Sequence, residues 1–199
     1  MPRLFTAFPV PALRALHEQA DAFRQADLRL RMESPERWHV TLNFLGDVAD
    51  SEVGSLAGQL RKVTCGVGPV PIRLQGLGAF PDLRLPRVIW VGVESSHELT
   101  LLHARLGRVI EEMGVPLEPV FVPHVTLARM RHRPSQRLCS LLEEQSHSPF
   151  GVIVPKEVML YESRPNAAGQ QYHVLERFVL HGDSLGGRFP GENPAEQGS

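Results

Sequence analysis

Residues 39–42 read His-Val-Thr-Leu, and residues 124–127 repeat the same four residues 85 positions further along the chain. Each copy lies inside a longer run in which apolar and polar side chains alternate, the pattern of a β-strand with one buried face. A repeat of four residues is not rare in a chain of this length, so identity alone decides little. Its placement decides more, because each copy follows a helical pattern and lies on a predicted strand. The repeat therefore predicts a molecule built from two related halves.

Alternation also places each histidine on the same face of its strand as the threonine two residues later. His39 and Thr41 point one way, as do His124 and Thr126, while the Val and Leu of each motif face the core. Two imidazoles that titrate near neutrality can act together as acid and base. Two hydroxyls can donate hydrogen bonds to anionic oxygens. This set suits attack on phosphorus without a metal, although two ordinary strands with a half-exposed His and Thr remain the alternative.

Strand and helix patterns continue to about residue 181. Helices are predicted from Pro11, from Asp50 or Ser51 to about Val63, from Ser95 or Ser96 to Met113, and from Pro134 to about Glu144. Strands are predicted at 4–8, 28–32, 38–45, 72–74, 88–93, 121–129, 152–154, 158–161 and 172–180. Most connections between strands are short, which favours antiparallel pairing. The sequence therefore predicts an α+β fold of two related lobes within one domain over residues 1–181.

The composition excludes several classes of protein. With 42% hydrophobic and 22% charged residues, the chain is typical of a soluble globular protein and unlike a coiled coil, a collagen or a disordered protein. No apolar run approaches the roughly 20 residues that span a bilayer, and the first residues lack the order of a secretory signal. The two cysteines, Cys65 and Cys139, form neither a disulfide framework nor a zinc site. We therefore expect a reduced, cytoplasmic protein without a membrane partner.

The charge pattern limits how the protein can bind nucleic acid. There are 21 basic and 22 acidic residues, a net charge of −1, which argues against broad electrostatic binding. Any contact with nucleic acid should therefore be local. Nineteen of the basic residues are arginine, which reflects either phosphate recognition or a GC-rich genome.

The last residues of the chain differ in composition from the rest. Residues 182–199 are rich in Gly, Pro, Asn and Glu, which predicts a disordered tail.

Several segments, taken in order, carry a family pattern: Arg3–Pro9, Trp38–Gly46, Gly76–Pro81, Arg87–Trp90, Pro123–Arg129, Leu160–Ser163, Tyr172 and Phe178. They resemble the 2H phosphoesterases, named for two His-x-Thr motifs, and within them the RNA 2′,3′-cyclic phosphodiesterases, also called 2′-5′ RNA ligases. The resemblance covers about residues 3–181. It implies two pseudo-symmetric antiparallel-sheet lobes with outer helices and a central cleft. It also implies an enzyme that uses no metal or cofactor and opens the 2′,3′-cyclic phosphate of RNA 3′ ends, or of nucleotides, to a 2′-phosphomonoester.

The resemblance assigns roles to residues of the two motifs. It implies that His39 is the acid and His124 the base, with Thr41 and Thr126 binding the phosphate. Arg129 has a phosphate-binding or a structural role, although alternation puts it on the face opposite Thr126 unless the strand bends there.

Aromatic residues near the motifs are candidates for binding the terminal base. Phe8, Phe44 and Phe121 could stack on it, although core packing is the alternative for each. The histidines at 97, 103, 147, 173 and 181 show no metal-ligand spacing and are expected at the surface or at helix caps. We expect no metal site and a monomer.

Two other functions stay open. The chain could hydrolyse the cyclic phosphate of a small nucleotide, or it could bind RNA ends without turnover. The same cleft could also join a 2′,3′-cyclic phosphate to a 5′-hydroxyl as a 2′-5′ linkage, although hydrolysis should dominate in water.

Overall fold

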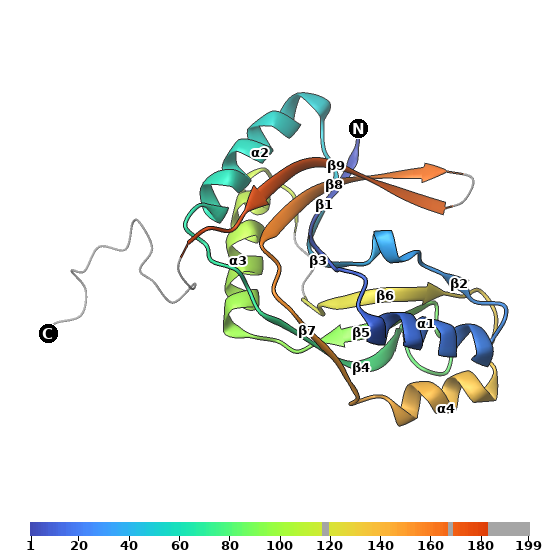
Figure 1. The fold of residues 1–199 in the computed structure, drawn as a ribbon. Coiled ribbons are helices and arrows are strands. Elements are labelled where there is room, and N and C mark those ends of the chain that lie inside the picture. Colours follow the sequence, from blue (N-terminus) through green and yellow to red (C-terminus); the bar gives the residue numbers. More distant parts are fainter. Residues whose placement is uncertain (117–119, 167–168, 183–199) are drawn as a thin grey trace, which may run out of the picture.

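The computed structural model describes residues 1–116, 120–166 and 169–182 (Figure 1). Its strands are β1 (Arg3–Pro9), β2 (Arg31–Met32), β3 (His39–Asp47), β4 (Ile72–Phe80), β5 (Val88–Val93), β6 (His124–Arg129), β7 (Pro149–Ile153), β8 (Glu157–Asn166) and β9 (Gly169–Val179). Its helices are α1 (Arg14–Ala26), α2 (Asp50–Thr64), α3 (His97–Glu112) and α4 (Gln136–Glu144), with a 3-10 helix at Pro35–Arg37. Apart from Gly182, the tail expected over 182–199 lies outside the described residues. None of the described helices is long and apolar enough to cross a membrane.

The strands form one antiparallel sheet in the order β7-β4-β5-β6-β3-β1-β8-β9, with β2 paired to β6. The two motif strands lie at its centre, where β3 meets β6 through the pair Val40 and Val125. This junction divides the sheet into two halves of four strands, β7-β4-β5-β6 and β3-β1-β8-β9. The predicted α+β class and the two related halves are therefore confirmed, as halves of one continuous sheet.

Two pairs of helices cover the sheet on its outside (Figure 1). Helices α2 and α3 pack on each other and on β9 and β3, whereas α1 and α4 pack on each other and on β7 and β4. Helix α1 follows β1 in sequence but packs on the half that contains β4, and α3 follows β5 but packs on the half that contains β3. Two helices thus pack on the half opposite to the strand before them, and the buried apolar side chains of both halves form one core cluster.

Local sequence explains where the helices begin and which face they bury. Ser96 caps α3, since its hydroxyl accepts from the backbone N–H of Leu99 at 3.1 Å. The apolar residues of α3 recur at helical spacing and are buried: Leu99, Leu102, Leu106 and Ile110. Helix α4 is capped in the same way by Ser135.

Both motif strands contain a β-bulge directly after the motif threonine. In the pairing of β3 with β1, the register shifts between Thr41 and Asn43, and in the pairing of β6 with β5 it shifts between Thr126 and Ala128. At each of these places one extra residue is inserted and two consecutive residues are buried. Strand β3 has a second register shift, between Phe44 and Gly46. After each bulge, the alternation of side chains resumes in the opposite phase. The bulge in β6 therefore puts Arg129 on the face that carries His124 and Thr126. Alternation alone predicted the opposite face for Arg129 unless the strand bends, and the bulge is this bend.

Candidate active site

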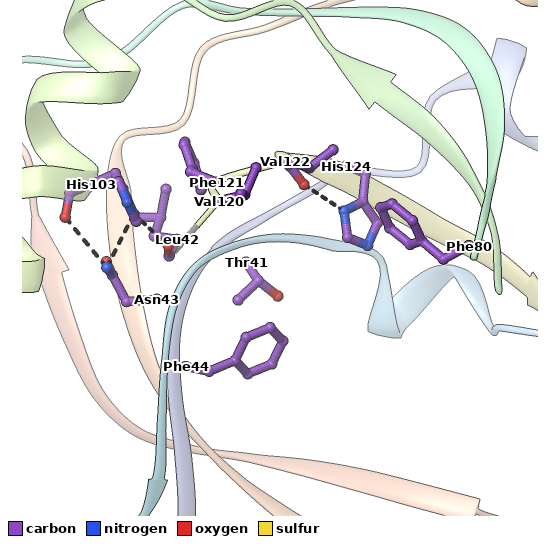
Figure 2. A pocket seen from close by; sticks show the side chains of 10 residues that line it. All are labelled: Thr41, Leu42, Asn43, Phe44, Phe80, His103, Val120, Phe121, Val122 and His124. Atoms are coloured by element: carbon purple, nitrogen blue, oxygen red, sulfur yellow. Dashed lines mark hydrogen bonds between the residues drawn. The ribbon is translucent and has the colours of Figure 1, made fainter. Parts of the chain in front are cut away.

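The sheet register gathers the four motif side chains on one face at the junction of the two halves. Because β3 and β6 run antiparallel and Val40 lies opposite Val125, the register continued outward sets Thr126 beside His39 and Thr41 beside His124. The motif valines are fully buried on the other face. Figure 2 shows Thr41 and His124 on facing sides of the same cavity.

Each motif histidine is held by the same backbone contact. His39 Nδ1 lies 2.6 Å from the carbonyl oxygen of Arg37, and His124 Nδ1 lies 2.7 Å from that of Val122. A carbonyl oxygen only accepts, so Nδ1 carries the proton in both rings. Nε2 is then the nitrogen that exchanges a proton with a substrate: a base when the ring is neutral and an acid when it is charged.

Aromatic rings pack against both imidazoles and fix their orientation. The His39 ring lies 5.1 Å from Tyr172, edge to face, and 5.2 Å from Phe5. The His124 ring lies 5.0 Å from Phe80, edge to face, and 5.9 Å from Trp90. The Trp90 ring lies directly over the backbone of Gly78 in β4. A Cβ atom at residue 78 would overlap the ring, so the glycine leaves the space that Trp90 occupies. The two halves therefore support their histidines in equivalent ways with different residues.

The surroundings of His39 also change its charge. Burial lowers the pKa of His39, and the positive charges of His124 and Arg129 lower it further, whereas the Arg37 carbonyl and the Glu33 carboxylate raise it. The neutral imidazole is therefore favoured in the free protein. This matters for its role, because a general acid must hold a proton when the leaving oxygen departs.

A cluster of charged residues lies beside His39, on the face of the sheet that carries the four motif side chains (the cleft face). Arg129 Nε donates to Glu33 Oε1 at 2.9 Å, and Arg37 Nη2 lies 2.9 Å from Glu33 Oε2. Arg37 Nη1 donates to the carbonyl oxygen of Gln170 in β9 at 2.7 Å. Burial raises the pKa of the neighbouring Tyr172, while the guanidinium of Arg129 lowers it.

A cavity of about 220 Å³ lies on the His124 side of the junction (Figure 2). Its lining residues are Thr41, Leu42, Asn43, Phe44, Phe80, His103, Val120, Phe121, Val122 and His124. The His103 ring stacks flat on Phe121, with centroids 3.9 Å apart, and its Nδ1 lies 2.8 Å from the Leu42 carbonyl oxygen. Asn43 Oδ1 is buried without a hydrogen-bond partner among the described residues. The cavity thus combines aromatic walls with polar groups, and Figure 2 shows those of His103 and Asn43 at the end away from His124.

The structure separates the three phenylalanines predicted to stack on a base. Phe44 is 47% exposed and Phe121 is partly buried, and both line the cavity. Phe8 is fully buried, so its predicted stacking role is wrong. Phe8 pairs across the sheet with Val40, which faces the core, and cross-strand partners share a face.

Sequence reasoning also missed part of the site. The surface placement expected for His103 is wrong, because α3 presents this residue to β3 and the cavity. Glu33, Arg37 and Tyr172 were not singled out as site residues either. The sequence held one signal for the first two, since Glu33 and Arg37 are oppositely charged and four residues apart just before the first motif. Within the described residues, no three His, Cys, Asp or Glu side chains are grouped so that they could hold a metal ion.

Comparisons with known proteins agree with this arrangement. The sequence pattern of the LigT-like phosphoesterases matches residues 8–90 and, separately, residues 91–169, so that each match contains one His-x-Thr motif. The RNA 2′,3′-cyclic phosphodiesterase of Aquifex aeolicus is 31% identical over 175 residues, which are 85% of this chain and 93% of that protein. The protein of the same name from Methanothermobacter thermautotrophicus is 32% identical over 161 residues, 80% of this chain and 88% of that protein.

A solved structure shows the same fold. The crystal structure of TT0787 of Thermus thermophilus matches with a TM-score of 0.76 at 27% identity, over 91% of this chain and 99% of that chain. Since both halves match the family pattern and the sequence relatives align over most of their length, the chain belongs to the LigT-like phosphoesterases.

Proposed function

We propose that the protein hydrolyses the terminal 2′,3′-cyclic phosphate of RNA to a 2′-phosphomonoester. The observation that carries this proposal is the pair of imidazoles, each with Nδ1 bound to a backbone carbonyl, on one face of two adjoining strands. The names of the curated relatives supply the substrate class. Hydrolysis of this diester needs a base for water and an acid for the leaving oxygen, which is what two such rings provide.

The proposed reaction is a displacement at phosphorus. His124 Nε2 takes a proton from water as the water oxygen attacks, and the bond from phosphorus to O3′ breaks. His39 Nε2 gives its proton to O3′, which leaves a 3′-hydroxyl and a phosphate on O2′. Thr41 and Thr126 donate hydrogen bonds to the non-bridging oxygens, and Arg129 offers a guanidinium to the same phosphate.

The lowered pKa of His39 sets a condition on this scheme. In the free protein the neutral ring is favoured, so His39 must regain its proton when substrate binds. The negative charge of the bound phosphodiester favours the imidazolium and raises the pKa of the ring. An acid role for His39 therefore requires that the phosphate bind close to it.

A substrate that does not need an acid tests this assignment. On a 3′-nitrophenyl phosphodiester, whose leaving group departs unprotonated, the activity of His39→Ala should be largely restored and that of His124→Ala should not. The opposite result would exchange the two roles. Equal loss in both variants would mean that neither residue acts mainly as the acid.

The cavity beside His124 offers a place for a nucleobase. Phe44 and Phe121 supply aromatic surface, and bases of single-stranded RNA commonly stack on such side chains. We therefore expect these two residues to contribute to binding of the terminal nucleotide.

One assay separates the candidate functions. The protein is incubated in EDTA with a 2′,3′-cyclic mononucleotide and with an oligoribonucleotide that has the same cyclic 3′ end, and the products are identified by ³¹P NMR. Our proposal predicts turnover of the oligonucleotide to the 2′-phosphate. Faster turnover of the mononucleotide would favour a small-nucleotide phosphodiesterase. Binding without turnover would leave an RNA-end-binding protein.

Reverse ligation is tested with the same substrates. Addition of an oligonucleotide with a 5′-hydroxyl should yield a small amount of 2′-5′-linked product, because the 5′-oxygen can replace water as nucleophile. The yield should stay low, since water is present at about 55 M.

A further inference from the structure

Two guanidinium groups bind the carboxylate of Glu33, one at each oxygen. Arg129 Nε lies 2.9 Å from Oε1, and Arg37 Nη2 lies 2.9 Å from Oε2. The Glu33 side chain is only 12% exposed, and its backbone N–H donates to the carbonyl oxygen of Leu127 at 2.8 Å. Glu33 is therefore fixed against β6 by its backbone and by its side chain.

Both arginines also touch parts of the site. The carbonyl oxygen of Arg37 accepts the hydrogen bond from His39 Nδ1, and its guanidinium reaches the Gln170 carbonyl in β9. Arg129 lies just beyond the bulge of β6, on the cleft face and next to Tyr172. Through these two residues Glu33 connects the first motif, the second motif and β9.

Without the negative charge of Glu33, Arg129 would have only positively charged residues, Arg31 and Arg37, beside it in this cluster. Its cross-strand partner in β2 is Arg31, which makes no ion pair among the described residues. Like charges directly opposite each other in a sheet repel. Arg37 adds a third positive charge at the same carboxylate. Glu33 balances this cluster and lets Arg129 stay on the cleft face.

We infer that Glu33 is a positioning residue, which holds Arg129 ready for the substrate phosphate and keeps Arg37, with its carbonyl, in place behind His39. The role of Arg129 toward phosphate rests on the proposed function. The placement of Glu33 beside His39 is independent of that function and can be tested in the free protein.

The charges around His39 give that separate test. From the segment before β3 it is faced by Glu33 and Arg37, from β6 by His124 and Arg129, and from β8 and β9 by Tyr161 and Tyr172. The Glu33 carboxylate raises the pKa of His39, and Arg129 and His124 lower it. Removal of the carboxylate leaves the positive charges uncompensated, so the pKa of His39 falls.

The first experiment measures this titration in the free protein. The ring of His39 is followed by NMR from pH 4 to 8 in the wild type and in Glu33→Gln, and is assigned by the loss of its signal in His39→Gln. We expect a lower pKa in Glu33→Gln. Glu162→Gln is the matched control, because Glu162 is equally buried and paired with Arg164 but lies in β8 on the face away from Tyr161. An unchanged pKa in Glu33→Gln, or an equal shift in both variants, would overturn the placement.

The second experiment measures the action through Arg129. On the cyclic-phosphate oligonucleotide, Glu33→Gln should raise KM about tenfold, as loss of one contact to a charged phosphate does, while Glu162→Gln leaves KM unchanged. In an Arg129→Gln background, Glu33→Gln should have little further effect on KM. Equal effects of Glu33→Gln in both backgrounds would contradict positioning through Arg129. Absence of turnover by the wild type would refute the proposed function and leave the titration to decide the placement of Glu33.

Discussion

At the scale of single residues, two backbone carbonyl groups decide which nitrogen of each motif histidine can react. The carbonyls of Arg37 and Val122 bind Nδ1 in both rings, so Nε2 is the reactive nitrogen on each side. The alternation of strand residues predicted which side chains share a face. It did not predict these carbonyl contacts, because they depend on how the chain turns into each strand two residues earlier.

The motif threonines give a prediction at the same scale. Thr41→Val and Thr126→Val keep the volume of the side chain and remove the hydroxyl that binds phosphate. A hydrogen bond to a charged group contributes about 1.5–3 kcal/mol, so kcat/KM should fall roughly tenfold to a hundredfold in each variant. Steady-state kinetics on the cyclic-phosphate oligonucleotide measures this loss.

Thr6→Val is the matched control for these variants. Thr6 is fully buried in β1, and its hydroxyl has no partner among the described residues. Its replacement should leave kcat/KM unchanged and should not lower the stability of the fold. Wild-type activity in both motif variants would show that Thr41 and Thr126 only pack.

At the scale of elements, the β-bulges after the two motif threonines explain where strict alternation stops giving the correct face of the sheet. Strict alternation predicted the positions of His39, Thr41, His124 and Thr126, which precede the bulges. It fails after them, where Phe44 and Arg129 return to the cleft face. A bulge is set by pairing with the neighbouring strand, so one strand's sequence does not reveal it.

Long-range pairing also explains the other differences in the sheet. Strand β4 was expected over 72–74 and runs on to Phe80, because a register shift at Gly76, with φ of 76°, lets the strand continue. Similarly, Phe8 faces the core beside its partner Val40 in β3, and the sequence of β1 alone does not reveal this pairing. The helices were predicted more closely, since their caps and apolar periodicity are local signals.

The contact between α1 and α4 gives the prediction at this scale. Asp27 follows α1, accepts hydrogen bonds from Arg29 and from the backbone N–H of Ser135 at the start of α4, and is 5% exposed. The hydrogen bonds from Arg29 lower its pKa to about 2. Its ionised form therefore stabilises the fold above the unfolded pKa near 3.8, and this contribution is lost as the pH falls toward 2.

We expect Asp27→Asn to lower the free energy of unfolding by about 1–2 kcal/mol at pH 7. The loss should be near the lower value, because Arg29 is exposed and solvent weakens its interaction with Asp27. Urea unfolding between pH 7 and pH 3 measures the difference from the wild type, which should shrink below pH 4. Asp21→Asn is the control, since Asp21 pairs with Arg24 at the surface and should matter little. A difference that stays constant with pH would contradict the role given to the Asp27 carboxylate.

At the scale of the whole molecule, the crossing of the chain joins the two halves into one structure. Helices α1 and α3 each pack on the half that does not contain the strand before them, and one core cluster includes residues of both halves. We propose on this basis that residues 1–181 form a single domain. The sequence repeat predicted two related halves, but it could not show that their helices are exchanged, because both arrangements have the same order of elements.

A single domain should unfold in one transition. With Trp38 replaced by Phe, the fluorescence of Trp90 reports on β5 in one half, while far-UV circular dichroism reports on the helices of both halves. We expect the two signals to change at the same urea concentration. Separate transitions would show that the halves fold independently.

The central claim is that one histidine from each half is needed for the same reaction. The most direct test compares the wild type with His39→Ala and His124→Ala on an oligoribonucleotide that ends in a 2′,3′-cyclic phosphate, with His97→Ala, which lies at the exposed start of α3, as the control. Loss of a positioned acid or base usually costs at least about a hundredfold in rate. We therefore predict a loss of that size in both motif variants, with circular dichroism unchanged and His97→Ala fully active. If either motif variant retains more than about a third of the wild-type rate, the two-histidine mechanism is wrong.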